Sequence, residues 1–262
     1  MNNITLPSPH RILKIVHETQ AEYTFRVACD KPVKHGQFFV LSIPKIGEAP
    51  ISVSAMGDHW VEFTIRKVGR LTEGIFGMAE GDTLFMRGPY GNAFPMDEFK
   101  GKNIVVIAGG TGMAAVRSTL QHFYDHPDDA QSVWLIAGFK DRGCVLFEED
   151  LKKFSRAFHT FYTLDNGPAE GFETGLVTAF VKNIPFDRFE DYDIIIVGPP
   201  VMIGFAARDC VSCGAVEEKI WVSFERKMSC SVGKCGHCKI NETYVCLEGP
   251  VFNYVKAKEL ID

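Results

Sequence analysis

Residues 103–116, NIVVIAGGTGMAAV, decide the fold of the second half of the chain. A run of apolar residues, typical of a buried strand, meets a turn of glycines and then a segment with the spacing of an amphipathic helix. Apolar strands and helices continue to alternate as far as KIWVSFE, residues 219–225. Such an alternation predicts a parallel sheet covered on both faces. We therefore expect an α/β domain over residues 99–224.

The turn inside this stretch is a candidate site for a phosphate-bearing ligand. It consists of Gly109, Gly110, Thr111 and Gly112, between a strand and a helix. Backbone N–H groups and the positive end of the helix favour a phosphate or pyrophosphate there, and glycines admit it without a Cβ clash. An ordinary tight strand–helix turn is the alternative, because the turn departs from the G-x-G-x-x-G fingerprint.

A second break follows a later apolar strand, at Gly198, Pro199 and Pro200. This is the carboxyl end of the strand, the edge at which open α/β sheets bind ligands. Two breaks at one edge support a ligand site better than either alone. Proline also suits the first turn of a helix, so simple helix initiation is the alternative.

The first part of the chain has a different residue pattern. Short segments rich in β-branched and aromatic residues are separated by glycine and proline, and no long helical period occurs among them. Several short strands at this spacing predict an antiparallel barrel or sandwich over residues 1–98. The expected strands are residues 23–29, 36–43, 51–56, 59–68 and 82–88.

Composition agrees with two domains and excludes some functions. The chain has 262 residues, of which 46% are apolar, enough to bury a large core. A net charge of −5 offers no basic field to a nucleic acid. Apolar runs such as IVVIA and IIIV are too short to span a membrane, and the N-terminal residues contain no stretch long enough for a secretory signal. We therefore expect a cytoplasmic protein without a nucleic-acid or membrane partner.

Residues 225–262 form a third segment, whose four cysteines are spaced C-x4-C-x2-C-x7-C. A disulfide knot, a zinc site and an iron–sulfur cluster are all open to such a group. Disulfides are rare in a reducing cytosol. Zinc ribbons prefer pairs of C-x2-C knuckles, whereas plant-type clusters use C-x4-C-x2-C and a distant fourth cysteine. The spacing favours a [2Fe–2S] cluster over zinc, with the ligands Cys230, Cys235, Cys238 and Cys246.

Several motifs resemble those of the ferredoxin–NADP reductase superfamily, in which a flavin-binding barrel precedes a nicotinamide-binding α/β domain. They are APIS at residues 49–52, VGRLT at 68–72, GPYGNAF at 88–94, AGGTGMAAV at 108–116 and VGPPVMI at 197–203. The resemblance implies FAD in the barrel, bound by Pro50, Ile51, Ser52, Thr64, Ile65, Arg66, Leu71 and Thr72. It also implies NADH in the α/β domain, bound at the two breaks described above and at Asp165.

Two positions depart from the superfamily. Its flavin strand usually begins with an arginine that contacts the FAD pyrophosphate, whereas this chain has Ala49. We therefore expect Arg66 or Arg70 to supply the charge. Many relatives carry a cysteine beside the nicotinamide ring, where this chain has Val197. An essential thiol is accordingly not expected in this active site.

The tail ERKMSCSVGKCGHC, residues 225–238, resembles a narrower branch of the superfamily. The branch comprises the electron-transfer subunit of dihydroorotate dehydrogenase, the gamma subunit of sulfhydrogenases and the corresponding subunit of anaerobic sulfite reductases. In this branch the four tail cysteines hold a [2Fe–2S] cluster. Together with GEAPISVS, VGPPVMI and GPVFNY, the tail is most similar to the sulfite reductase subunits. The resemblance covers essentially the whole chain.

The resemblance implies the electron-input subunit of an anaerobic sulfite reductase. Electrons would pass from NADH through FAD and the cluster to an iron–sulfur partner subunit, which serves a sirohaem subunit that reduces sulfite to sulfide. Hydride transfer between facing rings requires no acid–base residue, so no catalytic side chain is predicted. A dihydroorotate dehydrogenase or sulfhydrogenase subunit is the alternative enzyme. A zinc-stapled, nucleotide-binding redox sensor is the alternative that is not an enzyme.

Asp165 predicts a preference for NADH over NADPH. It follows the strand HTFYTL, residues 159–164, after which phosphate-choosing relatives usually place an arginine and a hydroxyl. No Arg or Lys occurs between Asp165 and Lys182, and a carboxylate there would repel a 2′-phosphate. The alternative is that Asp165 only begins a turn with Asn166 and Gly167.

Overall fold

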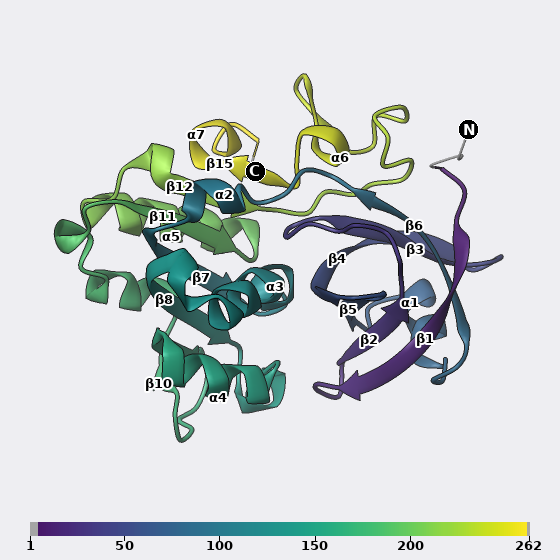
Figure 1. The fold of residues 1–262 in the computed structure, drawn as a ribbon, viewed down its shortest axis with the longest axis horizontal. Coiled ribbons are helices and arrows are strands. Elements are labelled where there is room, and N and C mark those ends of the chain that lie inside the picture. Colours follow the sequence, from purple (N-terminus) through teal and green to yellow (C-terminus); the bar gives the residue numbers. More distant parts are fainter. Residues whose placement is uncertain (1–4, 261–262) are drawn as a thin grey trace. The chain divides into compact units, whose positions relative to one another are not determined.

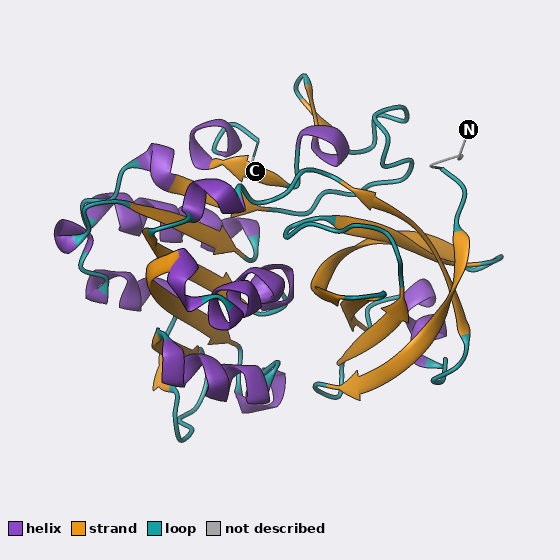
Figure 2. Ribbon diagram, viewed as in Figure 1, coloured by secondary structure: helices purple, strands orange, loops and turns teal. Residues whose placement is uncertain are grey.

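The computed structural model describes residues 5–260, which form two compact units (Figures 1 and 2). The first comprises the described residues up to Ala93 together with Glu225–Pro250, and the second comprises Phe94–Phe224 with the described residues from Val251 onward. The segment predicted as one tail is thus divided between the units. The structure does not describe residues 1–4, at the start of the first predicted domain, or residues 261–262, at the end of the predicted tail. No helix in the described part of the chain is both long and apolar enough to span a membrane.

The first unit is built on a closed antiparallel barrel with the strand order β1-β2-β5-β4-β3-β6. Its strands are β1 (Ser8–His17), β2 (Glu22–Ala28), β3 (Phe38–Ile43), β4 (Gly47–Gly57), β5 (Trp60–Arg66) and β6 (Thr83–Tyr90). The ring closes where β1 pairs with β6, beginning with Ser8 opposite Met86. Phe25, Phe39 and Phe63 are fully buried in its core. The predicted antiparallel barrel is confirmed.

Two further pieces complete the first unit. Helix α1 (Arg70–Phe76) packs against β3 and β4 and buries Ile75 in the barrel core. The cysteine-containing residues form little regular structure, which consists of β13 (Lys239–Ile240), β14 (Thr243–Tyr244) and α6 (Val245–Glu248). This segment therefore depends on side-chain contacts more than on a backbone ladder.

The second unit is a seven-stranded sheet in the order β10-β9-β8-β7-β11-β12-β15. Neighbouring strands run parallel except β12 and β15, which are antiparallel. The bounds are β7 (Lys102–Gly109), β8 (Ala130–Phe139), β9 (His159–Leu164), β10 (Glu173–Thr174), β11 (Tyr192–Val197), β12 (Ile220–Ser223) and β15 (Val251–Asn253). β7 and β11 are buried along almost their whole length, which explains their continuous apolar sequences.

Helices cover both faces of this sheet, as Figure 1 shows. Ile104 and Val106 of β7 face α3 and α4 in one apolar core, and α5 with η3 lies on the opposite face. The helices are α2 (Met96–Phe99), α3 (Gly112–Asp125), α4 (Glu148–Ala157), α5 (Pro200–Ser212) and α7 (Tyr254–Ala257). The short 3-10 helices are η1 (Pro127–Asp129), η2 (Arg142–Cys144), η3 (Val177–Asn183), η4 (Phe186–Arg188) and η5 (Glu217–Lys219). The predicted parallel α/β domain is confirmed.

Candidate cofactor and cluster sites

The two predicted nucleotide-binding breaks lie next to each other in the second unit. Ala108, near the end of β7, pairs with Val197 at the end of the neighbouring strand β11. The chain continues to β8 on one side of β7 and later to β11 on the other, so the order of strands reverses here. Open α/β sheets bind ligands at such a switch point, outside the carboxyl ends of the strands. The topology therefore brings both breaks to the edge where a nucleotide is expected.

Three glycines of these breaks are explained by packing between the two loops. A Cβ on Gly112 would overlap the carbonyl oxygen of Val197 and lie 2.9 Å from Cα of Gly198. Cβ atoms on Gly109 and Gly198 would both meet the side chain of Met202. Met202 is flexible and can move, whereas the backbone of Val197 cannot. Gly112 therefore lets α3 begin in contact with the end of β11.

Gly110 is the glycine of this turn that faces open space. Its φ is +54°, and a Cβ built on it would have no heavy atom within 4 Å. Its N–H donates to the carbonyl of Gly138 at the end of β8 (2.8 Å). Thr111 follows, exposed, at the start of the 14-residue helix α3. The open space beside Gly110 leaves room for a phosphate next to the positive end of the helix.

Asp165 stands at the same edge of the sheet, at the end of β9. Its N–H donates to the carbonyl of Phe139 (2.9 Å), and the N–H of Asn166 donates to that of Lys140 (2.9 Å). Burial raises the pKa of the Asp165 carboxyl above its ordinary value. The sequence argument for NADH rests on the residues that follow β9 and does not include Lys140. The structure brings the backbone of Lys140 to the same turn.

The predicted flavin-binding residues come from β4, β5 and α1 of the first unit. Pro50, Ile51 and Ser52 are half-buried on β4, where Pro50 lies opposite Val40 of β3. Leu71 of α1 is half-buried and packs on the barrel core. These four side chains keep part of their surface open to a ligand.

Two other predicted residues, Thr64 and Ile65, have side chains committed to the barrel. The hydroxyl of Thr64 hydrogen-bonds with the hydroxyls of Thr24 (2.9 Å) and Ser54 (3.1 Å). Ile65 is 1% exposed and belongs to the apolar barrel core. Their side chains therefore support the strand rather than present a contact to a ligand.

The side chain of Thr72 is held by hydrogen bonds, whereas that of Arg66 is largely exposed. The hydroxyl of Thr72 accepts from the N–H groups of Val68 and Gly69 (both 3.0 Å) and donates to the Gly69 carbonyl (2.9 Å), which closes the first turn of α1. Arg66 Nε lies 3.1 Å from Glu22 Oε1, yet the arginine side chain is 57% exposed. Thr72 thus acts as a helix cap, whereas Arg66 keeps a solvent-facing charge.

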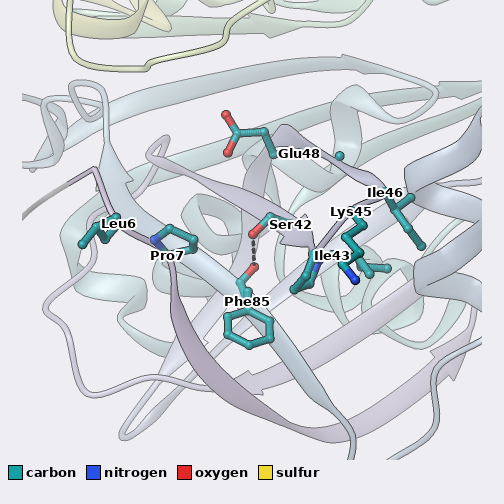
Figure 3. Close-up of a pocket in the computed structure, with 10 residues that line it drawn as sticks. Leu6, Pro7, Ser42, Ile43, Lys45, Ile46, Glu48 and Phe85 are labelled. Atoms are coloured by element: carbon teal, nitrogen blue, oxygen red, sulfur yellow. Dashed lines mark hydrogen bonds between the residues drawn. The ribbon is translucent and has the colours of Figure 1, made fainter.

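A pocket of about 710 Å³ lies beside the turn between β3 and β4 (Figure 3). Figure 3 shows Leu6 on one side of Ser42 and Ile46 on the other, and the Ser42 hydroxyl donates to the carbonyl of Phe85 (3.3 Å). None of the predicted flavin-binding residues lines this pocket. Glu48, which does line it, also pairs with Arg87 of β6 (2.8 Å).

Backbone N–H groups of the cysteine segment point at two of the predicted ligands. The N–H groups of Lys234 and Cys235 each lie 3.3 Å from Sγ of Cys230. The N–H of Gly233, whose φ is +70°, lies 3.3 Å from Sγ of Cys246. Such donors can hydrogen-bond to the sulfur of a metal-bound thiolate. The loop is therefore arranged to receive metal-bound sulfur.

Neighbouring thiols and burial shift the pKa of two of the four cysteines in opposite directions. Cys235 interacts with Cys230, and a backbone hydrogen bond at Cys230 is the leading cause that lowers the pKa of Cys235 to about 7. Burial raises the pKa of Cys246 to about 12, and a contact with Cys238 is the second cause. Within residues 5–260, no three His, Cys, Asp or Glu side chains are arranged to hold a single metal ion. The cysteine spacing therefore remains the ground for preferring a [2Fe–2S] core to tetrahedral zinc.

A buried hydroxyl in this loop supports the same assignment. Ser231 is 1% exposed and has a φ of +60°. Its Oγ meets no hydrogen-bond partner among the residues that the structure describes. Burying an unpaired hydroxyl is costly. A cluster held by the adjacent Cys230 would bring acceptor sulfur atoms close to this hydroxyl.

Arg87 on β6 links the barrel to the cysteine segment, and none of the motifs predicts it. The arginine side chain is 4% exposed. Its guanidinium donates from Nη1 to the carbonyl of Cys230 (2.8 Å) and from Nη2 to that of Ser229 (2.7 Å). It also contacts Glu48 Oε1 (2.8 Å) and the hydroxyl of Tyr90 (3.3 Å). A lone arginine within the otherwise apolar strand LFMRG is the sequence signal that points to such a residue.

Comparison with known proteins agrees with this layout. Residues 106–208 match the oxidoreductase NAD-binding domain, and residues 225–258 match the iron-sulfur cluster binding domain of dihydroorotate dehydrogenase B. The gamma subunit of sulfhydrogenase 2 from Pyrococcus furiosus is 35% identical over 91% of this chain and 86% of its own. A probable dihydroorotate dehydrogenase B (NAD(+)) electron transfer subunit from Methanocaldococcus jannaschii is 31% identical over 92% of this chain and 88% of its own.

Solved structures share the fold. The structure of an NADH-dependent reduced ferredoxin-NADP oxidoreductase matches with a TM-score of 0.80 and 22% identity, over 97% of this chain and 90% of that chain. A ferredoxin NADP+ reductase from Neisseria gonorrhoeae, with bound FAD and NADP, matches with a TM-score of 0.69 and 21% identity, over 83% and 98%. The comparisons confirm the predicted fold class, and the two matched domains support the predicted NADH and iron–sulfur cluster.

Proposed function

Because this chain belongs to the family of NAD-dependent electron-transfer subunits that includes the sulfhydrogenase gamma subunits and those of dihydroorotate dehydrogenase B, we propose that it oxidises NADH and passes the electrons to a partner subunit. One observation carries the proposal: a glycine turn at the switch point of a sheet and a segment with four closely spaced cysteines occur in one chain. NADH gives up two electrons together, whereas an iron–sulfur centre takes one at a time. FAD bound in the barrel supplies the conversion between the two.

The protein's own residues bind and orient these groups. Gly110 and Thr111 would receive the pyrophosphate of NADH at the start of α3. Residues 50–52 would line the flavin, and the exposed guanidinium of Arg66 would offset the FAD phosphates in place of the arginine absent at Ala49. Two of the four cysteines would bind each iron, with the loop N–H groups stabilising the sulfur charge. No step requires a side chain to take or give a proton.

Two classes of partner are candidates for the electrons. The named relatives favour a hydrogenase-type or dihydroorotate dehydrogenase-type partner, because they match over nine-tenths of this chain. The motif combination, including Ala49 at the head of β4, favours an iron–sulfur subunit that serves a sirohaem sulfite-reducing subunit. We rank the first class ahead of the second, since it is supported by whole-chain identity rather than by motifs.

The experiment starts with the chain purified without oxygen. We expect one FAD and two irons per chain, and NADH-dependent reduction of a one-electron dye. The partner is then isolated from anaerobic cells with the tagged chain, and NADH oxidation by the complex is measured with orotate, with protons or sulfur, and with sulfite. NADH oxidation that occurs with sulfite, and with none of the other acceptors, would establish the second class of partner. Zinc in place of iron, together with absent flavin, would contradict the proposed function altogether.

A further inference from the structure

Arg87 and the turn that follows it hold both ends of the cysteine segment. Arg87 bonds the two carbonyls at the start of the segment, as described above. At the other end, the side-chain amide of Asn92 donates to the carbonyl of Glu248 (2.9 Å), and the N–H of Asn92 donates to that of Gly249 (2.8 Å). A Cβ on Gly91 would lie 2.8 Å from the same Gly249 oxygen. One short stretch of the barrel, residues 87–92, therefore anchors the segment twice.

The direction of the first two carbonyls bears on the sulfur ligands. A planar trans peptide points its C=O and its N–H to opposite sides. With the carbonyls of Ser229 and Cys230 turned to the guanidinium, the N–H groups that share these peptides point away from it. The chain then enters the stretch in which the N–H groups of Lys234 and Cys235 reach Sγ of Cys230. Arg87 thus sets the direction in which the loop leaves the barrel.

We propose that Arg87 is a positioning residue for the iron–sulfur cluster, and that it fixes the Cys230 end of the loop through a fork of hydrogen bonds. The inference rests on the proposed function for the identity of the bound group. The guanidinium makes five hydrogen bonds, with the acceptors on Glu48, Tyr90, Ser229 and Cys230. A lysine has the same charge but lacks the planar fork that reaches two carbonyls and a carboxylate together.

Geometry, rather than charge, is the property that this position needs. The carboxylate of Glu48 lies 2.8 Å from the guanidinium and offsets its charge at close range. The two carbonyls of the segment accept from different nitrogens of Arg87, so both peptides are oriented by one rigid group. Replacing arginine by lysine therefore separates the two roles, because it keeps the charge and removes the fork.

Arg87→Lys in the full chain, purified without oxygen, tests the proposal. We expect unchanged FAD content, iron retention weakened about 10–100-fold against a chelator, as is typical when support of a metal ligand is lost, and a changed EPR spectrum of the reduced cluster. In cluster-free protein, alkylation of Cys230 should be faster than in the wild type. Arg26→Lys is the matched control, because Arg26 on β2 pairs with the buried Glu62 (2.7 Å) within the barrel.

The proposal is wrong if Arg87→Lys shows the iron retention, EPR spectrum and Cys230 reactivity of the wild type. It is also wrong if Arg26→Lys shows the same changes as Arg87→Lys. If Arg87→Lys does not fold, Glu48→Ala removes a carboxylate that is 41% exposed and leaves the guanidinium without its orienting partner. This variant should lose iron faster with FAD retained, and unchanged iron retention would count against the proposal. If the wild type holds zinc, the proposed function fails, but Cys230 alkylation in metal-free protein still decides the role of Arg87.

Discussion

The turn after β7 and the cysteine segment are both proposed ligand sites, but they are held in place by different means. The sheet fixes the turn, since Gly110 bonds to the end of β8 and Gly112 packs against the last peptide of β11. The cysteine segment has two strands of two residues and a helix of four, and barrel side chains anchor it. A site at strand ends is thus formed by the fold, whereas a site in an irregular segment needs anchors and its metal.

Removing a metal ligand is the most severe test of this difference. Cys235→Ser should abolish the EPR signal of a reduced [2Fe–2S] cluster, because each iron needs two thiolate ligands. FAD should stay bound, and NADH should still bleach the flavin absorbance, since the turn and the barrel do not depend on the segment for their shape. Loss of the NADH response together with the cluster would break the comparison. A signal that persists in the variant would remove Cys235 from the ligand set.

Substitution of the two differently placed glycines should separate packing from ligand approach. Gly112→Val should destabilise the protein by about 3 kcal/mol or more, because its side chain would meet the immobile backbone of Val197. Gly110→Ala should cost about 1–2 kcal/mol for its left-handed φ, without a steric clash. Chemical denaturation measures both values.

The same pair of variants also tests ligand binding in the turn. The KM for NADH should rise in Gly110→Ala, with flavin content unchanged, because the added Cβ lies in the open space where a phosphate approaches. An unchanged KM in this variant would mean that the turn serves the fold alone. Similar unfolding free energies for the two variants would contradict the packing role of Gly112.

Substitution of Arg66 should have an effect of intermediate size, on FAD binding. Arg66→Ala should weaken FAD binding about tenfold, which is about 1.4 kcal/mol, because it removes an exposed guanidinium from the barrel unit. Arg70→Ala is the comparison variant, since Arg70 is the other candidate for the charge missing at Ala49. FAD content and dissociation constant are measured by flavin fluorescence. Full retention in Arg66→Ala with loss in Arg70→Ala would move the role to Arg70.

Nucleotide choice should show the smallest change. The wild type should use NADH with a higher kcat/KM than NADPH, and Asp165→Arg should shift the ratio about tenfold toward NADPH, or about 1.4 kcal/mol. Lys140→Ala serves as the companion variant, because the structure brings this residue to the same turn. It should lower any residual use of NADPH. A wild-type preference for NADPH would show that the cation at Lys140 outweighs the carboxylate.

The fold was predictable from sequence where burial is continuous or strictly alternating. β7 and β11 are buried on both faces, so their apolar runs identify the parallel sheet. β1 escaped prediction because Ile12 is its one fully buried residue and polar side chains, among them Arg11 and Lys14, interrupt the apolar pattern. β15 also escaped, since its three residues become a strand through pairing with β12, which no local pattern encodes.

The site was predictable where its residues are close together in the chain. The cysteine spacing predicts a cluster because all four proposed ligands lie in one segment, which matches an iron–sulfur binding domain. Arg87 and Lys140 act on residues that are distant in sequence, so no local motif reports them. The position of the glycine turn was readable, but which glycine faces the ligand was not. That distinction depends on packing against β11, a strand far along the chain.

The pairing of β12 with β15 has a consequence for how the cluster-binding residues can vary. Ser223 lies opposite Val251, so residues 224–250 form the loop of a long antiparallel hairpin at the edge of the sheet. The entropy cost of closing a flexible loop grows with the logarithm of its length, by about 0.6 kcal/mol for each doubling. Insertions and deletions in this loop therefore cost little to the hairpin that closes it. The metal-binding sequence can change in length and surface without a change in the register of the nucleotide-binding sheet.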